Sequence, residues 1–422
     1  MNRVKLKSRE AGKGADYQMA RNYLVVKATI ICVLLAGGFL VTAPPQHAQQ
    51  KKTVPRQRNR QSQPVKQANQ TSRTPARQSD IKLRLVYPNG LALDPEDNLY
   101  ISDTGTHRIL KLDRQRRLTV IAGTGEGGFG GDGGPAVKAQ LFSPHDLAFD
   151  AEGNIMVADT FNHRIRRIDR QGVITTVAGN GKTEYSGDNG PALKASFNNP
   201  QSIALDPDGN ILVADTHNYV VRKVDRSGMI RTFAGSVPGF SGDGGPANKA
   251  QLSLPMAVAV APDGSVFISD AGNSRVRRVS IDGKIQTLVG YGPGEGVYGA
   301  GFAGDGGPPE KAKIFSATDL EVDHAGSLYI SDSGNNRIRV IRNGIITTIA
   351  GSGRVGFGGD GDKALAAELN TPQKIVIAKD GTVYIADRAN HRVRKVDAKG
   401  VINTIAGEGK PTGVLLNPEV IQ

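Results

Sequence analysis

Six aspartates recur along the chain at nearly constant spacing and are its most regular residues with chemical potential. They are Asp103, Asp159, Asp215, Asp270, Asp332 and Asp387, separated by 56, 56, 55, 62 and 55 residues. A carboxylate can serve as an acid, a base or a metal ligand. An Asp in a tight turn, however, usually accepts backbone N–H bonds. Six equivalent copies therefore favour a structural role over a single active site.

Histidines form the second group of candidates. His107, His163 and His391 occupy matched turns in the first, second and sixth copies, and His145 opens a run in the second. Zinc needs three or four ligands that converge within ~2.0–2.3 Å. Spacing alone does not bring these side chains together, so we expect no metal site, no cofactor and no catalytic residue.

The segments that carry these residues are copies of one unit. Each copy holds four short runs rich in Val, Ile and Leu, separated by turns of Gly, Asp, Asn and Pro, which is typical of strands. In the first copy the runs are Leu91–Leu93, Leu99–Ser102, Ile109–Leu112 and Thr119–Ile121. Four antiparallel strands repeated radially make a propeller blade. The sequence predicts an all-β fold, a six-bladed β-propeller of four-stranded antiparallel blades.

The repeated sequence motifs resemble those of a known family. The second copy contains IMVADTFNHRIRRID, and the connector Gly128–Pro144 reads GFGGDGGPAVKAQLFSP. These segments resemble the NHL repeat, and the connector is similar to that of the teneurin NHL-like propeller. The resemblance covers about residues 81–422 and implies a closed propeller. It leaves function open, because the family includes scaffolds, nucleic-acid binders, sensor domains and a few enzymes.

The places where the copies differ are the best candidates for a site. Antiparallel topology puts the connectors, the turns between second and third strands, and the mouth of the central channel on one side. The residues that open the first strands should ring this mouth: Asn89, His145, Gln201, Met256, Thr318 and Gln373, with Asp146 and Asp319 next. Related lyase-like and lactonase-like propellers place carboxylates and His around a metal there, whereas this chain offers mostly neutral amides and a Met.

Two departures point to blades four and five. Glu321 stands where four sibling copies have Ala, so it is either paired with a neighbouring Arg or water, or a functional acid. The fourth connector is longer and Gly-rich, and aromatic loops on a rigid scaffold are favoured binding elements. The tentative ligand-binding residues are Glu321, Asp319, Thr318, His145, Gln201, Tyr298 and Phe302.

Three further expectations concern the frame. Each connector should form one or two helical turns after its proline. The third-strand arginines should lie on a solvated face with their heads paired to Asp. The C-terminal residues Leu415–Ile421 repeat the start of a blade and should close the ring.

The first eighty residues differ in composition from the remainder. Residues 1–23 form a basic tail, residues 24–43 an apolar transmembrane anchor or signal segment, and residues 44–80 a disordered polar linker before the propeller of residues 81–422. Residues 1–80 hold 15 Lys and Arg against 3 Asp and Glu, while the remainder holds 38 against 37. The basicity thus belongs to the tail, and nucleic acid is an unlikely partner.

These features favour a membrane-tethered or exported propeller that acts as a non-enzymatic binding or scaffold module at the cell envelope. Its partner would be a protein, a peptide or an envelope glycan, and its N-terminal segment would meet the membrane. The propeller would then be extracytoplasmic, and periplasmic or secreted if the segment is cleaved. The alternative is a propeller lyase or lactone hydrolase with its site at the channel mouth.

Overall fold

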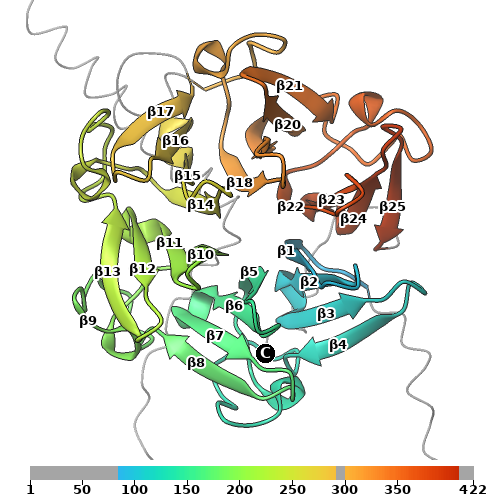
Figure 1. Ribbon diagram of the computed structural model, residues 1–422. Coiled ribbons are helices and arrows are strands. Elements are labelled where there is room, and N and C mark those ends of the chain that lie inside the picture. Colours follow the sequence, from blue (N-terminus) through green and yellow to red (C-terminus); the bar gives the residue numbers. More distant parts are fainter. Residues whose placement is uncertain (1–83, 291–299, 408–422) are drawn as a thin grey trace, which may run out of the picture. The chain divides into compact units, whose positions relative to one another are not determined.

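The computed structural model describes residues 84–290 and 300–407, and it divides the chain into two units, Met1–Ala76 and Arg77–Gln422. The described residues all lie in the second unit. They form six antiparallel sheets arranged in a ring (Figure 1), which confirms the predicted six-bladed propeller. The predicted N-terminal anchor and linker and the predicted closing strand at Leu415–Ile421 lie outside the described residues. No helix within the described ranges is long and apolar enough to cross a membrane.

Each blade is built from four consecutive strands. Blade one contains β1 (Pro88–Leu93), β2 (Leu99–Asp103), β3 (Arg108–Leu112) and β4 (Leu118–Ala122). Blade two contains β5 (Pro144–Phe149), β6 (Ile155–Asp159), β7 (Arg164–Ile168) and β8 (Ile174–Ala178). Blade three contains β10 (Pro200–Leu205), β11 (Ile211–Asp215), β12 (Val220–Val224) and β13 (Met229–Ala234), and β9 (Gly190–Pro191) from the preceding connector joins its outer edge.

The other three blades repeat the pattern. Blade four contains β14 (Pro255–Val260), β15 (Val266–Asp270), β16 (Arg275–Val279) and β17 (Ile285–Val289). Blade five contains β18 (Ala317–Val322), β19 (Leu328–Asp332), β20 (Arg337–Arg342) and β21 (Ile345–Ala350). Blade six contains β22 (Pro372–Ile377), β23 (Val383–Asp387), β24 (Arg392–Val396) and β25 (Ile402–Ala406).

Short 3₁₀ helices lie in one turn of all six blades and in each of the five connectors between consecutive blades. Those between the second and third strands are η1 (Thr104–Thr106), η3 (Thr160–Asn162), η5 (Thr216–Asn218), η7 (Ala271–Asn273), η10 (Ser333–Asn335) and η12 (Arg388–Asn390). Those in the connectors are η2 (Ala136–Lys138), η4 (Ala192–Lys194), η6 (Ala247–Lys249), η9 (Pro309–Lys311) and η11 (Ala364–Ala366). The connectors therefore form one short turn each, at the lower end of the prediction.

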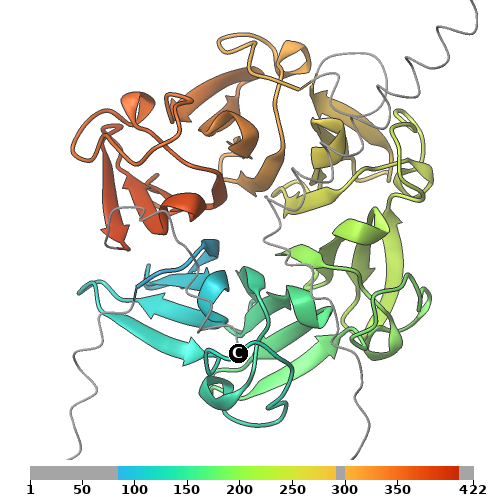
Figure 2. The same ribbon diagram turned by 180° about the vertical axis from the view of Figure 1, so that it is seen from behind.

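The first strand of each blade faces the ring centre. In Figures 1 and 2 the strands β1, β5, β10, β14, β18 and β22 surround the centre, and the fourth strands lie at the periphery. Every first strand has an irregularity after its opening residue, as between Pro88 and Leu91 in blade one. Such a bulge re-aims side chains. It directs the opening residues of the first strands toward the channel mouth.

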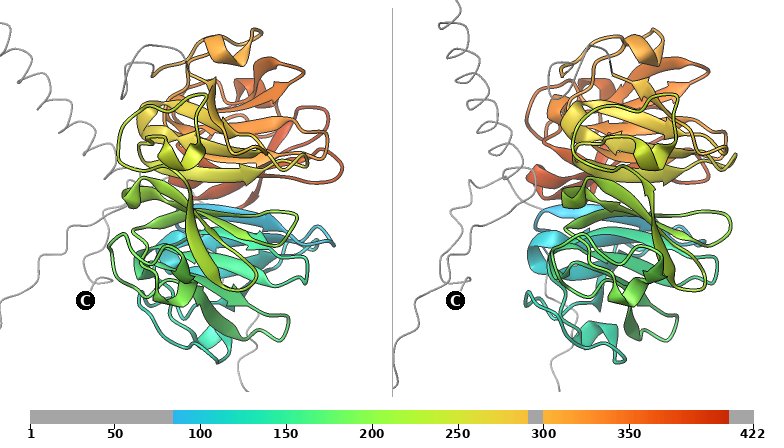
Figure 3. Two further views of the ribbon diagram at one scale, coloured as in Figure 1. Left: turned by 60° about the vertical axis from the view of Figure 1, so that its left-hand side comes forward. Right: turned by 90° about the vertical axis from the view of Figure 1, so that its left-hand side faces the viewer.

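Apolar side chains fill the spaces between neighbouring blades, which stand side by side in the edge views of Figure 3. One such cluster joins Leu91 and Leu110 of blade one to Val376 and Val393 of blade six. Among the described residues, the ring therefore closes by packing of the first blade on the last. A backbone N–H of Tyr87 also donates to His391 Nδ1 at 3.0 Å across this junction.

Candidate functional site at the channel mouth

A small polar cleft opens at the channel mouth where the first strands begin. It is lined by Asn89, His145, Asp146, Gln201, Ser202, Thr318, Asp319 and Lys374. Four of the predicted ligand-binding residues, His145, Gln201, Thr318 and Asp319, are thus brought together from three blades. Its cavity volume is about 10 Å³, roughly the space that one water molecule needs.

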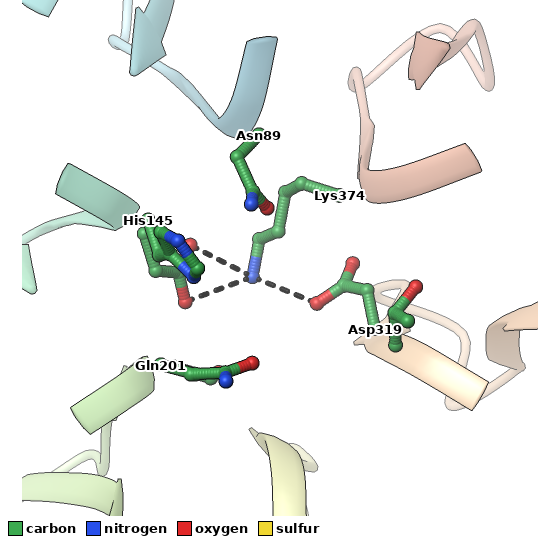
Figure 4. Close-up of a pocket in the computed structure, with 8 residues that line it drawn as sticks. Asn89, His145, Gln201, Asp319 and Lys374 are labelled. Carbon is green, nitrogen blue, oxygen red and sulfur yellow. Dashed lines mark hydrogen bonds and ion pairs between the residues drawn. The ribbon is translucent and has the colours of Figure 1, made fainter. Parts of the chain in front are cut away.

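A lysine occupies the centre of this cleft (Figure 4). Lys374 Nζ of blade six lies 3.2 Å from Asp319 Oδ1 of blade five and 3.4 Å from Asp146 Oδ1 of blade two. All three side chains are more than nine-tenths buried. Blades two and five stand on opposite sides of a six-membered ring, so the lysine bridges the channel. This ion-paired cluster ties three blades together at the axis.

Both aspartates also bind the neighbouring blade. Asp146 accepts the backbone N–H of Ile203 at 3.0 Å, and Asp319 accepts that of Ile375 at 2.9 Å. In blade three Ser202 Oγ takes the same place and accepts the N–H of Val258 at 3.3 Å. The third residue of the first strand therefore bonds adjacent blades to each other in these three cases. In blades two and five this residue carries a charge.

Burial shifts the protonation of these acids. It raises the pKa of Asp319 to about 7, although Lys374 opposes the shift. Burial also raises the pKa of Glu321 to about 8. The charge of Lys374 opposes this shift, whereas the charges of Asp319 and Asp146 add to it. For Lys374 burial works to lower the pKa, but the three acids outweigh it and the net pKa is raised. Near neutral pH the cluster therefore holds a charged lysine and a largely protonated Glu321.

Glu321 lies two residues deeper along β18 than Asp319, on the same side of the strand. Its side chain is half-buried. Its place is that of Ala92, Ala148, Ala204 and Ala259 in the sibling blades. The charge of Lys374, a cation that the sequence did not single out, acts on Glu321.

His145 is neutral in this site. It is 5% exposed, and burial together with the charge of Arg388 lowers its pKa to about 3. Its ring lies 6.2 Å from that of Phe161. A neutral imidazole can donate one hydrogen bond and accept another, so His145 can orient a ligand without contributing charge.

The matched turn histidines have a backbone role instead. His107, His163 and His391 end their turns in the left-handed conformation, with φ of 54°, 54° and 55°. The Nδ1 of His107 accepts the N–H of Ser143 in the next blade at 3.1 Å, and His163 does the same for Asn199 at 3.2 Å. Within the described ranges no three His, Cys, Asp or Glu side chains are placed to hold a metal ion.

The recurring aspartates are confirmed as structural. Asp159, for example, accepts the N–H of Phe142 at 2.8 Å and the amide of Asn162 at 2.8 Å, and it faces Arg166 at 3.4 Å. Burial raises its pKa to about 6. Equivalent bonds hold the start of each first strand against the turn between the second and third strands.

The prediction of a solvated arginine face is wrong for the central arginine of the third strand. Arg166 is fully buried, and it donates to Asp132 at 2.7 Å and to the carbonyls of Gln140 and Gly130. The connector folds back over the strand and covers this side chain. Its counterparts, also fully buried, are Arg222, Arg277, Arg339 and Arg394. The predicted pairing with Asp is confirmed, and in each case the connector supplies the Asp.

Phe302 also lies in a connector and packs against the arginines of the third strand. Its ring lies 3.8 Å from the guanidinium of Arg337 and 5.0 Å from that of Arg339. Phe129 and Phe240 stack on arginines in the same way in other blades. Phe302 is therefore a repeated feature, although 42% of its surface is exposed and available to a ligand. Tyr298 lies outside the described residues.

Two functional candidates escaped the sequence prediction, Lys374 and Arg388. The third residue of the first strand is Gly, Asp, Ser, Ala and Asp in blades one to five, and Lys only in blade six. The residue after the recurring Asp is Thr, Thr, Thr, Ala and Ser in blades one to five, and Arg only in blade six. The signal in the sequence is that blade six alone has a basic residue at each of these two repeat positions.

The family model for the teneurin NHL domain matches residues 81–186, 180–239, 236–280 and 354–418. The chain belongs to the NHL-repeat β-propeller family. It is 33% identical over 286 residues to teneurin-1 of Mus musculus, a match that covers 60% of this chain and 10% of that protein. This propeller thus spans about a tenth of its teneurin relatives.

Two other similarities bear on the fold of this NHL-repeat propeller. The chain is 28% identical over 328 residues to the chloroplastic protein SUPPRESSOR OF QUENCHING 1 of Arabidopsis thaliana, covering 74% of this chain and 30% of that protein. A solved auxiliary nutrient binding protein from Bacteroides thetaiotaomicron superposes with a TM-score of 0.53 at 17% identity, covering 77% of this chain and 70% of that one. At this identity the structural similarity shows the propeller fold alone.

Proposed function

We propose that this NHL-repeat propeller is a non-enzymatic binding module at the cell envelope, with a protein, peptide or glycan partner on its connector face. The connector face means the described parts of the five connectors, residues 123–143, 179–199, 235–254, 300–316 and 351–371. Nine of the twelve exposed large apolar side chains in the described residues lie there. Exposed apolar side chains concentrated on one set of loops mark interaction surfaces. This concentration is the observation that carries the proposal.

The state of the channel mouth supports binding over chemistry. Lys374, Asp146 and Asp319 already neutralise one another, and both aspartates are engaged with backbone N–H groups. A group held in this way is poorly free to transfer protons. The cavity volume of about 10 Å³ also leaves no room to enclose a substrate in this conformation.

A lyase or lactone hydrolase at the channel mouth is the second candidate. The observation that favours it is Glu321, whose pKa of about 8 keeps it protonated near neutral pH, while His145 of the same channel mouth is neutral with a pKa of about 3. Paired groups with separated pKa values are typical of general acid–base sites. Turnover of a lactone or of an ester-linked peptide that is lost in Glu321→Gln would establish the enzyme and overturn the binding proposal.

The binding experiment uses the full chain and isolated cell-envelope material. A repeated exposed position carries Val137, Leu193 and Leu365 in three connectors, and the third connector has Asn248 there. Replacing all three by Asn follows this natural example and should preserve folding. We expect at least a tenfold loss of envelope binding in a co-sedimentation assay.

The matched control replaces three exposed apolar residues outside the connectors, Met229, Ile281 and Ile345, by Asn. This variant should bind envelope material as the parent does. Equal loss in both variants would mean that binding is general stickiness, and no loss in the connector variant would refute the connector face.

The proposed location follows from the N-terminal segment. Residues 24–43 are apolar and the tail of residues 1–80 is strongly basic, a combination suited to an anchor beside an anionic membrane. Protease added to intact cells or spheroplasts should digest the propeller. A protected, soluble pool of the full chain would contradict the extracytoplasmic location.

A further inference from the structure

Among the described residues, blade six contains a buried arginine whose side chain makes no hydrogen bond or ion pair. Arg388 in η12 of blade six is 6% exposed. Its Nε is fully buried without a hydrogen bond, and in the described part of the chain no acceptor or carboxylate binds its guanidinium. The group nearest to its charge is the ring of Tyr87, whose centroid lies 5.0 Å from the guanidinium carbon. An unpaired buried charge is costly, so this arginine calls for an explanation.

The sibling blades show that the fold does not need an arginine here. Thr104, Thr160 and Thr216 occupy the same position, and each hydroxyl donates to the carbonyl of the proline that opens the next blade, at 2.6 to 2.8 Å. In blade six the long guanidinium replaces this short bond at the junction with blade one. The frame therefore loses an inter-blade hydrogen bond where Arg388 stands.

A second unpaired donor lies at the same place. Gln373 is 5% exposed, and its Nε2 is buried without a partner. Its counterpart in blade five is Thr318, which bonds directly to Ser333, the counterpart of Arg388. The two positions are thus neighbours within a blade. Arg388 and Gln373 each have a buried N–H group that finds no acceptor in the described structure, although the unbonded Oδ1 of Asn390 belongs to the same turn as Arg388.

The surroundings fit an anion of single charge. Burial lowers the pKa of His145, and the positive charge of Arg388 lowers it further, so the imidazole is neutral. Asn89 of blade one lies between His145 and Lys374 at the mouth (Figure 4). The acids of the Lys374 cluster stand close by and would repel a doubly charged phosphate. A carboxylate suits one guanidinium, which can grip both of its oxygens.

We propose that Arg388, with Gln373 and Asn89, binds a carboxylate at the channel mouth between blades six and one. The inference deepens the proposed function, on which it rests, by assigning the partner a carboxylate group such as a peptide C-terminus or an acidic sugar. The rest of such a partner would lie over the connector face, since the cleft admits only a small group.

The test measures the melting temperature of the full chain in acetate, phosphate or chloride at equal ionic strength and pH 7. Acetate at ten times its dissociation constant should raise the melting temperature by ~2 °C over chloride. Arg388→Thr restores the sibling residue, so without acetate it should melt no lower than the parent, and acetate should no longer stabilise it. Arg167→Thr, at an exposed arginine of β7, should respond to acetate as the parent does.

Several results would overturn the inference. No stabilisation of the parent by acetate, or full stabilisation of Arg388→Thr, would remove the site. Phosphate acting as strongly as acetate would refute the carboxylate class. If Arg388→Thr does not fold, Arg388→Gln replaces it, and a lower melting temperature in both variants with no acetate effect in the parent would make the arginine structural.

The same variants separate this inference from the proposed function. Envelope binding should fall in Arg388→Thr, and peptides with a free C-terminus should compete for it better than amidated ones. Envelope binding that persists in Arg388→Thr would refute the carboxylate link and leave the connector face standing. Acetate stabilisation without any envelope binding would support the site and refute the proposed function.

Discussion

Replacing Lys374 by methionine tests whether the axial cluster holds the ring together. Methionine has similar length but no charge, so Asp146 and Asp319 would lose a cation that lies 3.4 Å and 3.2 Å away. Breaking a buried ion pair by removing one partner typically costs ~3–5 kcal/mol. Both aspartates keep a backbone N–H bond. We therefore expect the lower end, ~3 kcal/mol, or a melting temperature ~4–6 °C lower for a propeller of this size.

The assay is thermal and urea unfolding of the full chain, followed by circular dichroism. The matched control is Lys223→Met, because Lys223 Nζ lies only 2.7 Å from Asp206 but in a more exposed pair. This substitution should cost no more than ~1 kcal/mol. Adding Asp146→Asn and Asp319→Asn to Lys374→Met should recover most of the loss, since the amide oxygens still accept the backbone bonds. Equal losses of stability in Lys374→Met and Lys223→Met would refute the role of the axial cluster. So would a triple variant that is no more stable than Lys374→Met.

The remaining predictions concern pH, the connectors and the turns. Folding raises the pKa of Glu321 from 4.5 to about 8, so the stability that protonated Glu321 contributes is complete below pH 4.5 and falls as pH rises toward 8. In urea unfolding, Glu321→Gln should be as stable as the parent at pH 4 and more stable at pH 8.5, by at most ~5 kcal/mol. A stability difference that does not change with pH would contradict this linkage. Arg166→Leu copies Leu110 of blade one, yet it should cost ~3–5 kcal/mol and speed hydrogen exchange in residues 123–143, because the connector loses its buried anchor; unchanged exchange would show that the connector is held otherwise. His391→Asn should fold nearly as well as the parent, because Asn336 already accepts the equivalent N–H at 2.9 Å, whereas His391→Ala should lower the melting temperature by several degrees; equal effects would mean that this acceptor does not matter.

The repeat period was enough to predict the fold, because it reports one unit that must pack against copies of itself. The alternation within each copy then located the strands and the face that carries the mouth. That is why His145, Gln201, Thr318 and Asp319 were assembled correctly. Each opens a first strand, and position in the repeat alone places it.

What the sequence could not show is contact across the ring or from a loop that folds back. Lys374 and Asp146 are 228 residues apart, and no local pattern pairs them. Arg166 looks solvated within its own strand, because the connector residues that cover it, such as Asp132, belong to a segment 34 residues earlier. The arginines were therefore misjudged for a tertiary reason, and Lys374 was missed because its partners lie in other blades.

The distribution of charge around the mouth is itself an argument about where function lies. To close the ring, each blade needs only a neutral side chain that bonds to the next blade, as Ser202 of blade three accepts the N–H of Val258. Blades two, five and six instead place buried charges there, and the uncompensated one is Arg388. Buried charge lowers stability unless it is paired. The ion pairs of Lys374 account for the charges of that cluster, whereas Arg388 has the ring of Tyr87 beside it and a buried Nε without an acceptor. The proposed carboxylate would supply this acceptor.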